Sequence, residues 1–77
     1  MNKTTIENND FKIEKFLIEE SEQDVYEYFI INKKTKNDYF FKMNFHDFKI
    51  NNFRKNSKPN NYKDNKEDLL NIFNILN

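Results

Sequence analysis

Residues 24–45, DVYEYFIINKKTKNDYFFKMNF, contain two strand-like runs joined by a polar segment. The first run, 24–32, is rich in β-branched and aromatic residues, which favour strands. The second run, 38–45, alternates large apolar residues with polar ones, so that Phe41, Met43 and Phe45 lie on one face of a strand. Together the two runs predict an antiparallel hairpin.

The turn of this hairpin has to form without glycine, because the chain contains none. The connecting segment 32–38 is polar throughout. Asn37 and Asp38 are the residues in it that best tolerate a left-handed backbone. We therefore expect one of these two residues to have a positive φ.

The segment 11–20 (FKIEKFLIEE) starts as a strand and then loses its alternation. Phe11 and Ile13 alternate with polar residues, whereas the apolar residues at 16–18 follow one another directly. This change indicates either a β-bulge or a helix, and we favour the strand. Residues 1–9 are polar and are expected to fray, although TTIE at 4–7 also matches a helix capping box.

The C-terminal part of the chain predicts a loop followed by a helix. Residues 46–53 fit no single period, and residues 54–65 (RKNSKPNNYKDN) are expected to form a loop around Pro59. The segment 65–76 predicts an amphipathic helix that Asp64 caps, with Glu67 three residues further on. Its apolar stripe, at i, i+3, i+4 and i+7, consists of Leu69, Ile72, Phe73 and Leu76.

These elements predict a single small α+β domain over residues 1–77. Its fold is an antiparallel β-meander of about three strands, with the C-terminal amphipathic helix packed on one face. Apolar residues make up only 36% of the chain, but 13 residues are aromatic, and such large rings can build a core from a poor composition. We expect a small core dominated by phenylalanine.

The composition is that of a protein encoded by AT-rich DNA. Glycine, alanine and cysteine are absent, whereas asparagine occurs 15 times and lysine 12 times. Many of these residues therefore reflect codon composition rather than selected chemistry. The absence of cysteine and of an N-terminal apolar segment is typical of a cytoplasmic protein, and no apolar run is long enough for a membrane span.

Catalysis, metal binding and cofactor binding are not expected. His46-Asp47 is the only pair with acid–base character, and there is no second histidine or cysteine to complete a metal site. Phosphate-binding loops need glycine, which the chain lacks. Ser21 and Ser57 have no neighbouring residue in the sequence that would act as a general base and activate them as nucleophiles. We therefore predict a non-enzymatic protein without a cofactor.

Charge is distributed unevenly along the chain, although the net charge is zero. Acids predominate in residues 1–31 and bases in residues 32–66, which indicates either cross-strand ion pairs or a surface with two differently charged faces. The acids that cluster within residues 14–27 can occupy a basic groove of a nucleic-acid-handling protein. The predicted partner-binding residues are Glu19, Glu20, Glu22, Asp24, Tyr26 and Tyr28.

The basic segment 48–66 supports an alternative function, the binding of single-stranded nucleic acid. Cations that follow the phosphates, next to rings that stack on bases, are typical of such proteins. The residues predicted for this role are Lys49, Phe53, Arg54, Lys55, Lys58, Tyr62 and Lys63. A third hypothesis is a homodimer that forms through sheet edges or through the C-terminal helix.

The size, the composition and the lack of motifs are typical of small accessory proteins. Phages and mobile elements of AT-rich bacteria encode many such proteins, including inhibitors of host defence such as anti-CRISPR proteins. The likeness is one of size and character, because no stretch matches a particular family and no residue role can be carried over. The primary prediction is a protein-binding inhibitor or adaptor, acting in the host cytoplasm if a phage encodes it.

Overall fold

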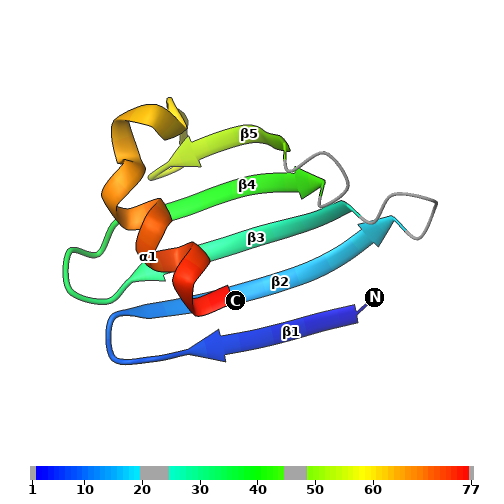
Figure 1. The fold of residues 1–77 in the computed structure, drawn as a ribbon, viewed down its shortest axis with the longest axis horizontal. Coiled ribbons are helices and arrows are strands. Elements are labelled where there is room, and N and C mark those ends of the chain that lie inside the picture. Colours follow the sequence, from blue (N-terminus) through cyan, green and yellow to red (C-terminus); the bar gives the residue numbers. More distant parts are fainter. Residues whose placement is uncertain (1, 20–24, 45–48, 77) are drawn as a thin grey trace.

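Each strand of this protein pairs with the strand before it, so the chain forms an antiparallel meander (Figure 1). The structure is a computed structural model, and it describes residues 2–19, 25–44 and 49–76. The six strands are β1 (Asn2–Glu7), β2 (Phe11–Glu19), β3 (Val25–Asn32), β4 (Asp38–Asn44), β5 (Lys49–Lys55) and β6 (Lys58–Pro59). A 3₁₀-helical turn, η1 (Tyr62–Asn65), leads into the helix α1 (Lys66–Leu76), which lies across one face of the sheet.

The predicted α+β class is confirmed, but the sheet has six strands rather than about three. The additional strands β1, β5 and β6 lie at or near the two edges of the sheet. Strands in such positions bury few side chains, so their sequences are polar and lack a clear apolar alternation. This polarity explains why their sequences are interpreted as a frayed end, a segment without a single period and a loop.

Strand β1 corrects the prediction for the N-terminus. All six of its residues pair in regular register with β2, from Asn2 opposite Leu17 to Glu7 opposite Lys12. Ile6 is half-buried against the core and anchors the strand. Pairing with β2 thus prevails over the weak local preference for a helix at residues 4–7.

Strand β2 confirms the preferred reading of the segment 11–20. Its register against β3 shifts between Leu17 and Glu19, so that Ile18 is an additional residue on β2. This irregularity lies where the apolar alternation breaks in the sequence. The break therefore reflects a bulge rather than a helix.

The hairpin of β3 and β4 is confirmed, but its positive φ belongs to Lys36, at 66°, and not to Asn37 or Asp38. The Asn32 Oδ1 atom accepts the backbone N–H groups of Lys34 and Thr35 at 3.0 and 3.1 Å, which closes the turn. The Asn37 carbonyl accepts the Asn32 N–H at 2.9 Å. This bond extends the strand pairing to Asn37, so Asn37 does not take the left-handed conformation. The positive φ is therefore found at the residue before it, Lys36.

The predicted loop 54–65 contains the end of β5, all of β6 and η1. Between β5 and β6, Asn56 and Ser57 have φ values of 53° and 66°, as in a tight two-residue hairpin turn. Asn56 Oδ1 also accepts the backbone N–H of Asp38 at 2.9 Å. Asparagine thus takes the role at this turn that glycine has in most hairpins.

The C-terminal helix begins within one residue of the predicted position, but its start is built differently. The Asn61 side chain caps η1 by accepting the backbone N–H of Lys63 at 2.9 Å. Asp64, the predicted cap, lies inside η1. Since η1 runs directly into α1, the cap is needed one turn earlier than the sequence pattern indicates.

The core lies between α1 and the face of the sheet that α1 covers. The buried apolar residues are Phe11, Ile13, Tyr28, Ile30, Tyr39, Phe41, Met43, Phe53, Leu69 and Ile72. Only three of these ten are phenylalanine, so the core formed by the described residues is mixed rather than dominated by phenylalanine. Part of the remaining phenylalanine lies on the opposite face of the sheet.

Candidate functional site

The face of the sheet opposite to α1, called the open face below, carries a row of aromatic rings, of which the middle one is exposed and the two outer ones are half-buried. Side chains of successive strand residues point to opposite faces, so the neighbours of the buried residues point away from the helix. On three adjacent strands these neighbours are Phe16 of β2, Phe29 of β3 and Phe40 of β4, which together form the phenylalanine stripe.

The rings of the phenylalanine stripe contact one another across the strands. The centroids of Phe16 and Phe29 lie 5.5 Å apart in an edge-on arrangement, and those of Phe29 and Phe40 lie 4.9 Å apart. Phe29 is 45% exposed, and Ile31 on the same strand and face is 46% exposed. The described residues place no helix over these side chains, so a continuous apolar strip faces solvent.

Acids and bases surround the phenylalanine stripe and pair with one another. Lys3 Nζ lies 2.8 Å from Glu14 and 5.9 Å from the centre of the Phe16 ring. On the other side of the stripe, Lys42 Nζ lies 3.9 Å from Glu27. The hydrogen bond from Lys3 holds the pKa of Glu14 below its ordinary value. Much of the charge beside the rings is therefore neutralised within the chain.

A shallow depression adjoins the stripe at the β4–β5 side of the open face. It has a volume of about 270 Å³ and is lined by Glu27, Phe29, Asp38, Phe40, Arg54 and Ser57. It offers a phenyl floor with both an acid and a guanidinium group at its rim. An apolar centre with a polar rim is the usual anatomy of a protein-binding surface.

The predicted acidic partner-binding residues are only partly described by the structure. Glu19 is the last residue of β2, whereas Glu20, Glu22 and Asp24 lie outside the described residues. The two tyrosines lie on the helix side of the sheet: Tyr26 is half-buried beneath the amino group of Lys15, and Tyr28 is completely buried. Burial raises the pKa of Tyr28, with a smaller contribution from Tyr26. The ring of Tyr28 is therefore part of the core.

The residues predicted for nucleic-acid binding are spread over different surfaces. Lys49 and Arg54 belong to the open face, because they lie opposite Asn44 and Phe40 of β4. Phe53 is buried against Tyr39 and Phe41, with ring centroids 5.9 and 6.1 Å apart, and cannot stack on a base.

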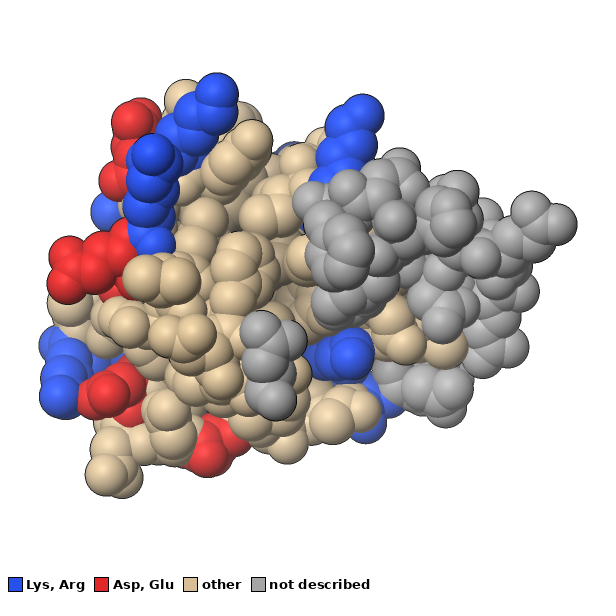
Figure 2. Space-filling view, viewed as in Figure 1, with Lys and Arg blue, Asp and Glu red and all other residues tan. Residues whose placement is uncertain are grey.

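The other predicted cations and Tyr62 lie elsewhere on the molecule. Lys55 and Lys58 lie opposite each other in the β5–β6 register, on the helix side of the sheet. Tyr62 and Lys63 belong to η1. Figure 2 shows the helix side, where acidic and basic side chains are intermingled near the start of α1. The structure thus does not gather the predicted set into one basic groove.

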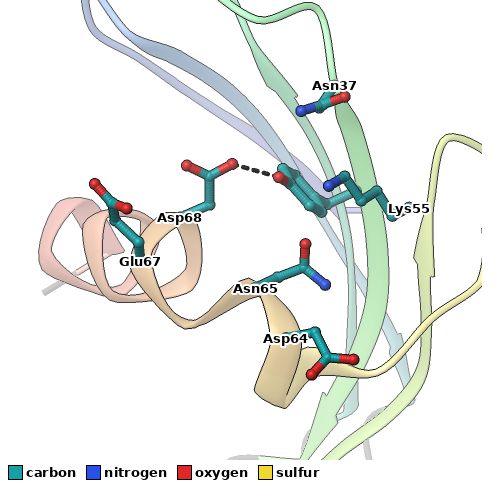
Figure 3. A pocket seen from close by; sticks show the side chains of 7 residues that line it. Asn37, Lys55, Asp64, Asn65, Glu67 and Asp68 are labelled. Atoms are coloured by element: carbon teal, nitrogen blue, oxygen red, sulfur yellow. Dashed lines mark hydrogen bonds between the residues drawn. The ribbon is translucent and has the colours of Figure 1, made fainter.

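A polar pocket of about 220 Å³ lies where α1 begins, between the helix, the start of β4 and the end of β5 (Figure 3). Its lining consists of Asn37, Tyr39, Lys55, Asp64, Asn65, Glu67 and Asp68. The Tyr39 hydroxyl donates a hydrogen bond to the Asp68 carboxylate inside it. Burial, and then this hydrogen bond, raise the pKa of Tyr39. The pocket therefore lies at a hydrogen-bonded contact between the helix and the sheet.

Metal binding and membrane insertion can be checked directly in the described part of the chain. No three histidine, acidic or cysteine side chains among the described residues come together in a way that would hold a metal ion. His46 and Asp47 lie outside the described residues. The helical segments in the described ranges are too short or too polar to cross a lipid bilayer.

The comparisons with known proteins found no match. No known protein family matches this chain, and neither a curated protein nor a solved structure is significantly similar to it. Function is therefore inferred from the surfaces of the chain itself.

The phenylalanine stripe was missed by the sequence reading, although the sequence contains a signal for it. Tyr28 to Ile31 and Tyr39 to Phe41 are uninterrupted apolar runs, so apolar residues occur at both odd and even positions of these strands. Such strands have two apolar faces. A single helix can cover only one of them, which leaves the other available to a partner.

Proposed function

We propose that this protein is a non-catalytic binding module, an inhibitor or adaptor, which occupies a partner protein through its open face. The observation that carries the proposal is the phenylalanine stripe, in which half-buried Phe16 and Phe40 flank the exposed ring of Phe29. Exposed contiguous apolar strips rimmed by polar groups are typical of protein interaction sites. Aromatic residues at the centre of such sites commonly supply most of the binding energy.

The charges around the stripe favour a protein partner over nucleic acid. Among the described strand residues, bases and acids occur on this face in similar number. The bases are Lys3, Lys12, Lys42, Lys49 and Arg54, and the acids are Glu7, Glu14, Glu27 and Asp38. A groove for nucleic acid needs an excess of unpaired cations along the phosphate path. A mixed rim instead fits a protein surface with an apolar centre and charges of both signs.

The proposal keeps the predicted class of function and moves the principal surface. Glu20, Glu22 and Asp24 remain predicted partner contacts, and a phage or mobile-element inhibitor of a host defence complex remains the setting that the composition favours. Phe29 replaces the two predicted tyrosines as the aromatic contact, because Tyr28 is inaccessible in the folded domain and Tyr26 lies half-buried on the helix side.

Site-specific photocrosslinking tests this function. A photoreactive phenylalanine analogue at position 29, in the host cytoplasm, should give one saturable crosslinked protein, and unlabelled wild-type protein should compete it away. The variant Phe29→Asp should fail to compete. Leu70→Asp is the matched control, since Leu70 is an equally apolar and more exposed residue on the helix side, at 62% exposure.

A titration with single-stranded RNA and DNA distinguishes the alternative function. Fluorescence anisotropy at about 50 and 200 mM salt should show no binding by the wild type at micromolar concentrations. Micromolar binding that collapses with salt and is lost in Phe29→Asp would instead assign the open face to nucleic acid. Equal competition by Phe29→Asp and wild type in the crosslinking experiment would rule the stripe out as the docking surface.

A further inference from the structure

The two edges of the sheet are built differently. At one edge, β6 has only two residues and includes Pro59, which cannot donate a backbone hydrogen bond. At the other edge, β1 has six residues in regular register with β2, and it contains neither proline nor a register shift. In Figure 1 β1 is the outermost strand, with no element of the described chain beyond it. Its outward backbone groups can therefore pair with another strand.

The sequence of β1 is self-complementary when the strand pairs with its own copy. A two-fold axis perpendicular to the sheet places two β1 strands antiparallel and keeps the same face of each sheet on the same side. With this axis at Thr5, Lys3 of each copy lies opposite Glu7 of the other copy. Both residues belong to the open face, since they lie opposite Phe16 and Lys12 of β2. The pairing therefore creates two cross-strand ion pairs between opposite charges.

Other registers of the same symmetry lose this complementarity. An axis at Thr4 places Lys3 opposite Thr5 and forms no ion pair, and an axis at Lys3 places two lysines against each other. The charge pattern thus selects one register, in which residues 3–7 of both copies are fully paired.

The existing ion pairs extend this complementarity. Lys3 already contacts Glu14 at 2.8 Å, and Glu7 contacts Lys33, while the side chains of Lys3 and Glu7 are still 51% and 49% exposed. In the dimer these residues line up as Glu14, Lys3, Glu7 of the second copy and Lys33 of the second copy. Charges alternate along this row, and the same row occurs twice.

We propose that the protein forms a homodimer through antiparallel pairing of β1 with β1 of a second copy, centred on Thr5. The two sheets then become one continuous sheet. Both α1 helices lie on one side of it, and both phenylalanine stripes lie on the other. The dimer presents two identical docking strips in one direction, and its formation does not depend on what those strips bind.

Charge reversal with complementation tests this dimer. In analytical ultracentrifugation over a concentration series, the wild type should be a reversible dimer. Lys3→Glu alone and Glu7→Lys alone each turn two attractive pairs into repulsive ones, so each should raise the dimer Kd by about tenfold or more. An equimolar mixture of the two variants should dimerise again, because glutamate at 3 in one chain faces lysine at 7 in the other, and glutamate at 7 faces lysine at 3.

The matched controls are Lys58→Glu and Glu67→Lys, which make the same charge changes away from β1. Each should dimerise like the wild type, and mixing them should have no additional effect. A wild type that stays monomeric at about 100 μM, or single variants that dimerise like the wild type, would overturn the proposal. Loss of the dimer in Phe29→Asp but not in Lys3→Glu would overturn it too, by placing self-association on the open face.

Discussion

The hydroxyl group of Tyr39 in β4 donates a hydrogen bond to the carboxylate of Asp68 in α1, across 29 residues of sequence. Tyr39 is buried beside Phe53, and its ring lies in the core that the helix covers. This bond therefore fixes where the first turn of α1 lies on the sheet. The bond lies inside the polar pocket of Figure 3, so this pocket is a point of contact between the helix layer and the sheet layer.

Removal of this hydroxyl group should weaken the packing of α1. In Tyr39→Phe the ring stays in place, but the half-buried Asp68 carboxylate loses its donor, which should lower the free energy of unfolding by about 1–3 kcal/mol. Urea denaturation followed by circular dichroism measures the change. Tyr62→Phe is the control, because Tyr62 is exposed in η1 and should unfold like the wild type. Equal midpoints for Tyr39→Phe and wild type would contradict this role.

Alkaline pH should destabilise the domain through its two buried tyrosines. The pKa values of Tyr28 and Tyr39 are both raised above the ordinary value of 10.0, chiefly because burial disfavours the charged phenolate. Above that pH the unfolded chain loses protons that the folded chain retains, so stability is full below pH 10 and falls as the pH rises further. Each tyrosine contributes a slope of up to about 1.4 kcal/mol per pH unit.

Urea denaturation at about pH 9, 10 and 11 checks this dependence. The double variant Tyr28→Phe/Tyr39→Phe should flatten it, because no buried phenol then remains to be titrated at these two positions. A wild-type stability that stays constant over this range would show that the two hydroxyl groups ionise in the folded protein.

Two phenylalanines on opposite faces of the sheet should differ sharply in their effect on stability. Phe41 is completely buried and stacks on Tyr28 with 5.0 Å between ring centroids, so Phe41→Ala should cost about 3–5 kcal/mol. Phe29 is nearly half exposed, so Phe29→Ala should cost about 1 kcal/mol. Chemical denaturation of both variants measures the contrast. A large loss in Phe29→Ala would mean that the stripe serves the fold rather than a partner.

Glycine at position 36 should stabilise the β3–β4 turn. Lys36 has a φ of 66°, which is unfavourable for a residue with a Cβ atom. Lys36→Gly should therefore raise the free energy of unfolding by about 0.5–1 kcal/mol, even though glycine adds flexibility to the unfolded chain. Lys34→Gly is the control: Lys34 has no positive φ, so the change should give no gain. A loss of stability in Lys36→Gly would count against the left-handed turn.

Local sequence pattern was sufficient where an element has one buried face and ends clearly. The β3–β4 hairpin and α1 follow directly from apolar spacing, and the bulge in β2 follows from the break of that spacing at 16–18. The edge strands could not be found in this way. Residues 2–7 become a strand because β2 supplies a partner for their backbone, and that partner is not visible in the segment itself.

The asparagines show both the value and the limit of a compositional argument. Their abundance reflects AT-rich codons, yet Asn8, Asn32, Asn56 and Asn61 each accept backbone N–H groups at a turn or cap. In a chain without glycine, a short side-chain amide is the available means of closing a turn. Which asparagines have this role depends on where the strands end.

The sequence by itself determined that this chain is a small α+β domain, because the spacing of apolar residues along one segment is a local property. Only the tertiary structure decided which face each ring takes. Phe40 and Phe41 are neighbours in β4, yet Phe41 is buried under α1 and Phe40 joins the phenylalanine stripe. Both faces of the central strands are apolar, and one helix covers only one of them. The face left open follows from how α1 packs on the sheet.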